Sequence, residues 1–306
     1  MRVCSVIRKS LRRARRSVVY ILNHPIAKKD KFNALKRYVL FHLVGRLLPG
    51  PAQFSYVGNV KFLARPGLAG IVGNIYMGLE DFEEMGFLLH FLREGDLFVD
   101  VGANVGAYTL LASGVCKAKS IAIEPIPTTF ELLMANLYIN DLLYLVEPVR
   151  VGMGSSESML YFTAGEDVLN RVILDERKGN SILVNVTTLD NLLREREPLC
   201  VKIDVEGWEF EVIRGANKTL NNDSLKAIIV ELHGHEHRYS FSYEDVHRVL
   251  AEHNFSPFAY NPFTRKLQLL ENFNHQKFNT LYVRDIGMVE QRVREAPVIK
   301  VLGEEF

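Results

Sequence analysis

The chain has 306 residues, and 48% of them are apolar, which is enough to bury one large hydrophobic core. Its three cysteines (Cys4, Cys116 and Cys200) form no C-x-x-C pair and no zinc-type spacing. The sequence therefore argues against a disulfide framework and predicts a protein of a reducing, cytoplasmic compartment. No apolar run reaches the length of a membrane-spanning helix.

The formal net charge of +1 hides an uneven distribution along the chain. Residues 1–37 carry 12 of the 37 Lys and Arg but only one of the 36 acids, Asp30, so their formal charge is about +11 and that of the rest is about −10. We therefore expect three regions: a basic helical extension over 1–50, a main domain over 51–290 and a C-terminal tail over 291–306.

The basic extension predicts two helices. Apolar residues recur at helical spacing over 3–22 until Pro25 ends the pattern. A second helix is expected from about Asp30 to Leu47, and its apolar side is expected to hold Phe32, Leu35, Val39, Leu43 and Leu47. A basic face beside an apolar stripe is typical of a helix in a membrane interface, which predicts peripheral contact with the cytoplasmic face of a membrane through residues 1–24. The alternative is a solvated or partner-bound helix. No aromatic residues are interleaved with the arginines, so nucleic acid is a less favoured partner.

The remainder predicts an α/β fold. Residues 54–66 contain two short apolar pieces around Gly58-Asn59 that predict a hairpin, and a helix is expected near 80–93. Strand-like runs then alternate with amphipathic helical segments, interrupted over 152–190 by short β-like pieces that predict an inserted hairpin or lid. Repeated strand–helix units indicate a mainly parallel sheet with helices on both faces. The expected strands are Leu97–Val101, Ser120–Ile123, Leu145–Val151, Leu199–Ile203, Lys226–Leu232, 256–260 and 279–284.

The first of these strands runs into a glycine-rich turn, Phe98-Val99-Asp100-Val101-Gly102-Ala103-Asn104-Val105-Gly106. Such a turn lets a ligand contact the backbone at the carboxyl end of a strand. The carboxylate of Asp100 would repel a pyrophosphate but would hold an ammonium or sulfonium group. The spacing is G-x-x-x-G, unlike the G-x-G-x-x-G of a phosphate-binding turn. The sequence therefore predicts a cationic nucleoside ligand such as S-adenosylmethionine.

Glu124 lies 22 positions after Gly102, at the end of the next expected strand. An acid at this point can accept hydrogen bonds from both ribose hydroxyls of an adenosine ligand, and it would reject a ribose phosphate. An acid that merely ends a strand is the alternative. Beside the glycine turn, the ribose role is favoured.

A second acidic group follows the strand Leu199–Ile203. Asp204 and Glu206 are expected at the carboxyl end of a central strand, where ligands of such sheets bind, and either could orient or deprotonate a substrate hydroxyl. Glu206 could instead complement the dipole of the following helix. Lys202 is expected to pair with an acid in the sheet or to lie at its edge.

The third group is Glu231-Leu232-His233-Gly234-His235-Glu236-His237, after the next strand. Alternating histidines can bind a metal, although histidines on such loops are often simply solvated. A metal would require His233 or Glu231 to converge with Asp204 or Glu206. We therefore expect no metal, and predict that His233 faces the substrate as a general base.

Together these segments resemble the FkbM family of S-adenosylmethionine-dependent methyltransferases over roughly residues 80–235. No single block carries the resemblance, but their order and spacing are specific. The matching blocks are Gly95–Thr109, Glu124-Pro125-Ile126-Pro127, Thr188-Leu189-Asp190 and Lys202-Ile203-Asp204-Val205-Glu206-Gly207.

The resemblance implies a class I, Rossmann-like sheet of seven mainly parallel strands, the last antiparallel. It also implies O-methylation of a hydroxyl on a sugar, a glycolipid or another small or lipid-linked acceptor. A nucleic-acid methyltransferase that uses the basic extension, and a non-catalytic membrane-peripheral module of the same fold, are the alternatives. The residues expected at the site are Asp100, Gly102, Asn104 and Gly106 for the methionine part of the donor, Glu124 for its ribose, and Asp204, Glu206 and His233 for catalysis.

Overall fold

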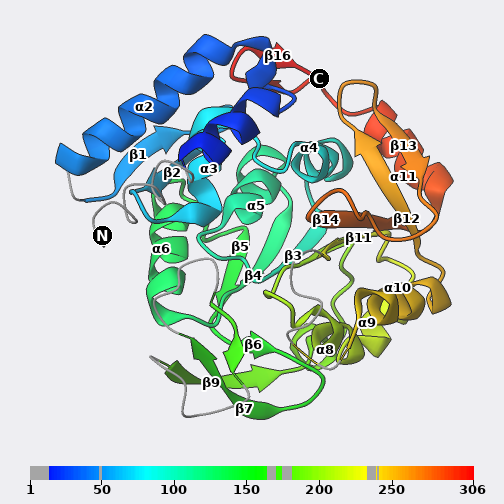
Figure 1. Ribbon diagram of the computed structural model, residues 1–306. Coiled ribbons are helices and arrows are strands. Elements are labelled where there is room, and N and C mark those ends of the chain that lie inside the picture. The colour runs from blue at the N-terminus through cyan, green and yellow to red at the C-terminus, as the bar shows by residue number, and fades with distance from the viewer. Residues whose placement is uncertain (1–13, 48–49, 164–169, 174–180, 233–238, 240) are drawn as a thin grey trace.

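The fold is built on one eight-stranded sheet (Figure 1). The structure, a computed structural model, describes residues 14–47, 50–163, 170–173, 181–232, 239 and 241–306. Along the sheet the strand order is β13-β12-β14-β11-β10-β3-β4-β5. The strands are β3 (Leu97–Val101), β4 (Lys119–Ile123), β5 (Val146–Val149), β10 (Cys200–Ile203), β11 (Ala227–Glu231), β12 (Ser256–Asn261), β13 (Lys266–Leu269) and β14 (Asn279–Val283).

The strand directions confirm the predicted class I arrangement. Strands β5, β4, β3, β10 and β11 are parallel, and β14 runs antiparallel to both of its neighbours, β11 and β12. The seven expected strands are therefore present, with the last of them in sequence reversed. The eighth strand, β13, was not predicted; it extends the sheet at its edge by a hairpin with β12.

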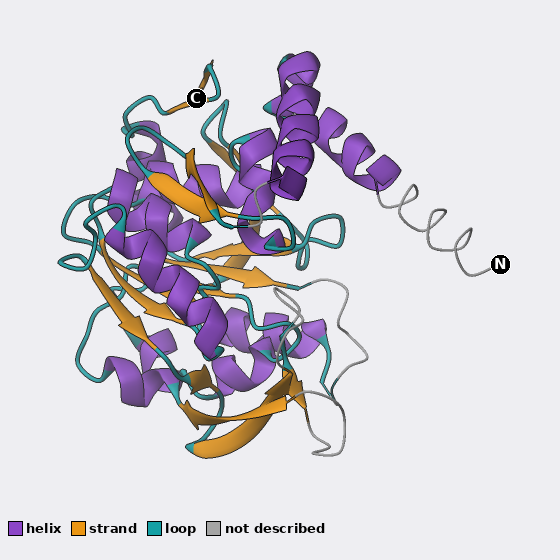
Figure 2. Cartoon of the chain, turned by 90° about the vertical axis from the view of Figure 1, so that its left-hand side faces the viewer, coloured by secondary structure: helices purple, strands orange, loops and turns teal. Residues whose placement is uncertain are grey.

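Side chains on the strands alternate between two hydrophobic clusters, one on each face of the sheet. On β3, Val99 and Val101 belong to one cluster and Phe98 to the other, and on β10 Val201 and Cys200 divide in the same way. Helices cover both faces, as a doubly wound sheet requires (Figure 2). The Phe98 face packs against α4 (Phe82–Phe91), α5 (Ala107–Thr109), the π-helical turn η2 (Leu110–Val115), α6 (Pro127–Tyr138) and α11 (Ile286–Arg294); the Val99 face packs against α7 (Leu189–Leu193), α8 (Glu209–Arg214), α9 (Asn217–Asn221) and α10 (Tyr243–Glu252).

The N-terminal region is helical over 14–23 and in α2 (Lys31–Leu47), with η1 (Ala27–Lys29) between them. Ile21 and Phe41 are buried in the same cluster as the Phe98 face of the sheet, so these helices pack on the domain. Residues 1–13, which include the first half of the amphipathic helix expected over 3–22, lie outside the described residues. The predicted hairpin is confirmed as β1 (Ala52–Ser55) with β2 (Lys61–Ala64), and α3 (Ala69–Met77) follows it.

The C-terminal residues pack against the N-terminal region and α4. The Nζ of Lys29 lies 2.6 Å from a carboxylate oxygen of Glu304, and the ring of Phe306 packs edge-on against Phe82. The short strands β15 (Lys300–Val301) and β16 (Glu304–Glu305) form this C-terminal hairpin. The boundary expected at residue 290 falls inside α11, so the final residues are part of the domain's packing.

The segment 152–190 folds into a second, four-stranded sheet of order β6-β9-β7-β8. Figures 1 and 2 place this sheet at the far side of the molecule from the N-terminal helices. The expected β-structure near 158–163 and 182–187 is thereby confirmed. Its strands are β6 (Gly152–Met153), β7 (Ser158–Thr163), β8 (Val172–Ile173) and β9 (Ser181–Thr187). Among the described residues, no helix combines the length and apolarity needed to cross a bilayer.

Candidate active site

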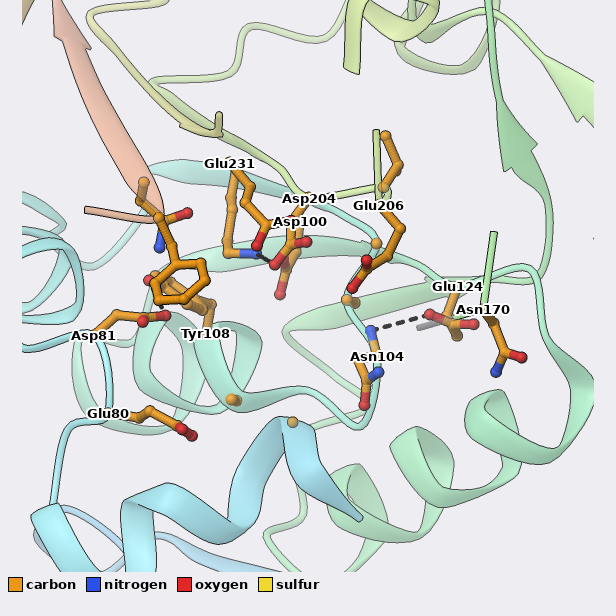
Figure 3. A pocket seen from close by; sticks show the side chains of 18 of the residues that line it. Glu80, Asp81, Asp100, Asn104, Tyr108, Glu124, Asn170, Asp204, Glu206 and Glu231 are labelled. Carbon is orange, nitrogen blue, oxygen red and sulfur yellow. Dashed lines mark hydrogen bonds and ion pairs between the residues drawn. The ribbon is translucent and has the colours of Figure 1, made fainter. Parts of the chain in front are cut away.

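A cavity of about 560 Å³ lies at the carboxyl ends of β3, β4, β10 and β11 (Figure 3). This is where an open α/β sheet binds its ligands, because the loops diverge there at the change of strand order. The start of β14, the turn before α4, the inserted sheet and the N-terminal helix over 14–23 complete its wall. Of the residues expected at the site, all except Gly106 and His233 are among the described residues that line the cavity. His233 lies outside the described residues, and its role as a base stays a prediction.

The glycine turn after β3 has the left-handed backbone that glycine permits. Gly102 has φ +79° and Gly106 has φ +94°, and Asn104 between them has φ +51°. A Cβ at Gly102 would overlap the carbonyl oxygen of Asp204, so the turns after β3 and β10 come too close for any other residue. At Gly106 a Cβ would meet Leu133 of α6. The turn therefore presents bare backbone to the cavity.

Asp100 is buried at the end of β3. One carboxylate oxygen, Oδ2, accepts hydrogen bonds from the backbone N and the Oγ1 of Thr109, at 3.1 and 2.6 Å. The other, Oδ1, is buried and has no hydrogen-bond partner among the described residues. Burial raises the pKa of Asp100, and the nearby ammonium of Lys202 opposes that rise. One oxygen of Asp100 thus anchors α5, and the other remains to accept from a ligand.

Glu124 links the ends of β4 and β3. Its Oε2 accepts from the backbone N of Asn104 at 3.1 Å, and its Oε1 accepts from the backbone N of Ile126 at 2.9 Å. A carboxylate has about four acceptor positions, so two remain for a pair of ribose hydroxyls. Burial raises the pKa of Glu124 to about 7. The residues present fit the donor: backbone and Asp100 for its amino acid part, and Glu124 for its ribose.

Beside Glu124 the cavity is lined by residues to which the sequence analysis gave no individual role. Pro125 and Ile126 follow β4, and Phe162 and Asn170 come from the inserted sheet and its loop. These give an apolar slot with one amide, which suits a flat base. Nothing in the spacing linked residue 162 to residue 124, because the contact arises only when the second sheet packs against the first.

At the end of β10, Lys202 forms a buried ion pair with Asp204. The distance from Nζ to Oδ2 is 2.6 Å, which confirms the expected pairing with an acid in the sheet. Burial acts to lower the pKa of Lys202, but the carboxylates of Asp204 and Asp100 outweigh it and raise that pKa. The same Nζ lies 4.7 Å from the ring centroid of Tyr108. The hydroxyl of Tyr108 in turn donates to Asp81 at 3.0 Å.

The turn after Asp204 is held by Glu209, the first residue of α8. Its Oε1 accepts from the backbone N of Val205 and of Gly207, each at 3.0 Å. Glu206 lies in this turn with φ +58°, and its side chain lines the cavity. The turn between β10 and α8 therefore sets the position of Glu206, which lies three residues before α8 begins.

Three carboxylates meet at this edge of the sheet. Oxygen atoms of Asp204, Glu206 and Glu231 all lie within 4.8 Å of one another. Burial, followed by the Asp204 carboxylate, raises the pKa of Glu231 well above its ordinary range. Glu231 ends β11, beside β10, so the two strand ends deliver the cluster directly.

On the other side of the cavity lie Glu80 and Asp81, before α4, and Tyr20 from the N-terminal helix. Figure 3 shows Glu80 and Asp81 across the pocket from Asn104 and Glu124, with Asp204 and Glu231 between the two groups. Burial raises the pKa of Glu80 to about 8. Sequence reasoning missed these residues, because an acidic pair before a helix carries no signal without the tertiary contact.

The comparisons with known proteins agree with this geometry. The model of the methyltransferase FkbM domain matches residues 100–257, which spans the glycine turn, Glu124 and the three-carboxylate cluster. The hexuronic acid methyltransferase AglP of Haloferax volcanii is 32% identical over 172 residues, which cover 55% of this chain and 67% of AglP. The methyltransferase sdnD of Sordaria araneosa is 30% identical over 175 residues, covering 46% and 67%. This chain therefore belongs to the FkbM family of methyltransferases, and S-adenosylmethionine is its methyl donor.

Proposed function

We propose that the protein methylates a hydroxyl group on a sugar or on another small or lipid-linked acceptor. The observation that carries this proposal is the cluster of Asp204, Glu206 and Glu231 beside the donor-binding turn. Carboxylates accept hydrogen bonds from hydroxyls and can take up their protons. The similarity to AglP, whose name gives a hexuronic acid as its substrate, supports a sugar in particular.

The charge of the cavity favours a hydroxyl over an anionic group. Seven acids line it against a single lysine, Lys202, among the described residues. A phosphate would meet several carboxyl groups and only one ammonium here, whereas the hydroxyls of a sugar would find many hydrogen-bond acceptors. The same argument disfavours a nucleic acid.

The bound donor supplies an electrophilic methyl group on a positively charged sulfur. The protein's own task is to place the acceptor oxygen in line with that methyl and to receive its proton. Asp204, held in its ion pair with Lys202, can accept the hydroxyl proton as the new C–O bond forms. The electron pair of the broken bond returns to sulfur, and the products are a methyl ether, S-adenosylhomocysteine and a proton.

The test uses a methyl-labelled donor with neutral glycosides, uronic acid glycosides and lipid-linked glycans as acceptors. Labelled product is then treated with mild alkali, which hydrolyses methyl esters and leaves methyl ethers intact. We expect alkali-stable label, reduced at least about 100-fold in Asp204→Asn if this carboxylate takes the proton. Label that is released by alkali, or that appears in RNA, would contradict hydroxyl methylation.

We also propose that the N-terminal helices contact an anionic membrane surface. The predicted apolar side of α2 faces outward: Phe32 is 77% exposed and Leu47 is 79% exposed, while Ala34 and Phe41 on the opposite side are buried. Apolar side chains beside a strongly basic segment suit the interface of anionic lipids. Tyr20 and Glu80 line both the main cavity and a 290 Å³ groove among helix 14–23, α2 and α3. That groove gives an apolar tail of a lipid-linked acceptor a path toward the site.

Flotation with vesicles of phosphatidylcholine and phosphatidylglycerol tests this contact. We expect the protein to float with these vesicles, and the double variant Phe32→Ser with Leu47→Ser to float less. Leu269→Ser is the matched control, since Leu269 is 63% exposed on the edge strand β13, outside this surface. If the double variant floats as well as the control, α2 does not form the contact.

A further inference from the structure

The cluster of Asp204, Glu206 and Glu231 has the geometry of a cation site. Its oxygens come from two adjacent strand ends and lie within 4.8 Å of one another. Oxygen ligands bind Mg²⁺ at about 2.1 Å and Ca²⁺ at about 2.3–2.6 Å, which places ligands on opposite sides of an ion about 4–5 Å apart. The three oxygens are therefore close enough together to be ligands of one such ion.

Two buried oxygen atoms at the same place have no donor. The Oε2 of Glu231 and the Oδ1 of Asn279 are buried, and neither has a hydrogen-bond partner among the described residues. Asn279 is only 5% exposed. The antiparallel register of β11 and β14 sets Glu231 directly opposite Asn279, so their side chains share one face of the sheet, and both line the cavity.

Leaving such oxygens buried without a partner is unfavourable, and more so for a charged group. A ligand that supplies positive charge removes this penalty. Carboxylate and amide oxygens are the ligands that hard divalent cations prefer. The unpaired amide oxygen of Asn279 is thus a second observation that points to a cation, independent of the carboxylate cluster.

The charge of the whole cavity points the same way. Its acids are Glu80, Asp81, Asp100, Glu124, Asp204, Glu206 and Glu231, and Lys202 is the single base in the described lining. The methyl donor brings one net positive charge, from an ammonium and a sulfonium less a carboxylate. A divalent cation would add positive charge at the point where three of these acids converge.

We propose that Asp204, Glu206 and Glu231, with the Oδ1 of Asn279, bind one divalent cation of the magnesium or manganese type. We expected no metal unless His233 or Glu231 converged with Asp204 or Glu206, and Glu231 converges with both. The Nζ of Lys202 lies beside this group, 2.6 Å from the Oδ2 of Asp204.

The role of the ion rests on the proposed function. A cation beside the donor turn would coordinate the acceptor oxygen and lower the pKa of its hydroxyl. With the ion bound, the proton would leave to water before attack, and Asp204 would hold the ion instead of taking the proton. The oxygen pair then forms the C–O bond, and the C–S pair stays on sulfur. The cation thereby positions the acceptor as well as activating it.

Binding of Mn²⁺ alone to the full chain tests the site without any turnover. Protein stripped with a chelator is titrated with Mn²⁺, and free Mn²⁺ is followed by electron paramagnetic resonance. We expect one bound ion per chain, an affinity lowered at least about tenfold in Glu231→Gln, and a smaller loss in Asn279→Ala. Glu80→Gln is the matched control, because Glu80 lines the same cavity on its far side (Figure 3).

Three results would overturn the site. The first is that no Mn²⁺ binds at millimolar concentration. The second is that Glu80→Gln lowers the Mn²⁺ affinity as much as Glu231→Gln, which would show only diffuse electrostatic attraction. The third is that Glu231→Gln keeps the full Mn²⁺ affinity. Calorimetry with S-adenosylhomocysteine on the same samples checks that each variant is folded. If the protein binds S-adenosylhomocysteine but not Mn²⁺, the proposed cation site is wrong and the methyltransferase assignment stands. If it binds Mn²⁺ but methylates no hydroxyl, only the proposed acceptor is wrong.

Discussion

The two sides of the pocket are built in different ways. On the donor side, Gly102, Asn104 and Glu124 come from two neighbouring strand ends. The backbone N of Gly102 donates to the carbonyl of Ile123, and that of Asn104 donates to the carboxylate of Glu124. On the far side, Tyr20 and Asp81 come from the N-terminal helix and the turn before α4, and they reach the cavity only through tertiary packing. The donor side is therefore fixed by the core fold, while the far side can change the acceptor without disturbing donor binding.

The largest expected effect is that of Gly102→Ala, which breaks the donor side. The control is Gly95→Ala, because Gly95 also has positive φ but has open space where its Cβ would lie. The left-handed backbone should cost each variant about 1–2 kcal/mol of unfolding free energy. Overlap with the Asp204 carbonyl should add about 1–3 kcal/mol in Gly102→Ala. Thermal unfolding measures the loss of stability in each variant, and calorimetry with S-adenosylhomocysteine measures its donor binding. If the two variants behave alike, the turns after β3 and β10 do not come as close together as described.

Lys202→Met should come next, because it removes the cation that lies between the two sides. Deleting one partner of a buried pair typically destabilises by about 3–5 kcal/mol, and Asp204 is one-third exposed, so we expect the lower end of that range. Lys226→Met, which breaks the more exposed pair with Asp285, should cost much less. Denaturant unfolding compares the two, and similar losses would contradict a special role for the Lys202 pair.

Glu124→Gln tests ribose binding on the donor side through the pH dependence of donor affinity. Because burial raises the pKa of Glu124 to about 7, its carboxylate is ionised only above that pH. Ionised oxygens accept hydroxyls better, so S-adenosylhomocysteine affinity of the unmodified protein should rise between about pH 6 and pH 8. Glu124→Gln should flatten this rise and lower affinity about tenfold at the upper end. A pH-independent affinity in the unmodified protein would argue against ribose binding by Glu124.

Tyr108→Phe should have the smallest effect of these variants and should change acceptor binding on the far side without changing donor binding. It keeps the ring beside Lys202 and removes the hydrogen bond to Asp81, at a cost of about 1 kcal/mol. We expect unchanged donor affinity and a higher KM for the acceptor. Tyr282→Phe is the control, since that buried hydroxyl bonds His247 outside the cavity. A weaker donor affinity in Tyr108→Phe would show that the two sides are not independent.

The sequence predicted what local chemistry determines. A glycine turn after an apolar run, and an acid at the end of the next strand, require only adjacent elements, so the positions of Gly102 and Glu124 at the site follow from the order of residues alone. The seven core strands followed from the same alternation. The edge strand β13 did not, because its residues Lys266–Leu269 are mostly exposed and carry no apolar run.

The rest of the pocket depends on contacts that span the chain. Asn279 reaches Glu231 only through the register of an antiparallel strand 48 positions away, and Phe162 reaches the cavity through the packing of a second sheet. Likewise, the apolar side of α2 was visible in the sequence, but not that it faces outward. Such features follow from tertiary geometry, which no local pattern encodes.

The most direct test of the account is a crystal structure with S-adenosylhomocysteine. The account predicts both ribose hydroxyls on the carboxylate of Glu124 and the thioether sulfur facing Asp204 and Glu231. A ribose placed away from Glu124, or a sulfur directed away from the three carboxylates, would contradict it.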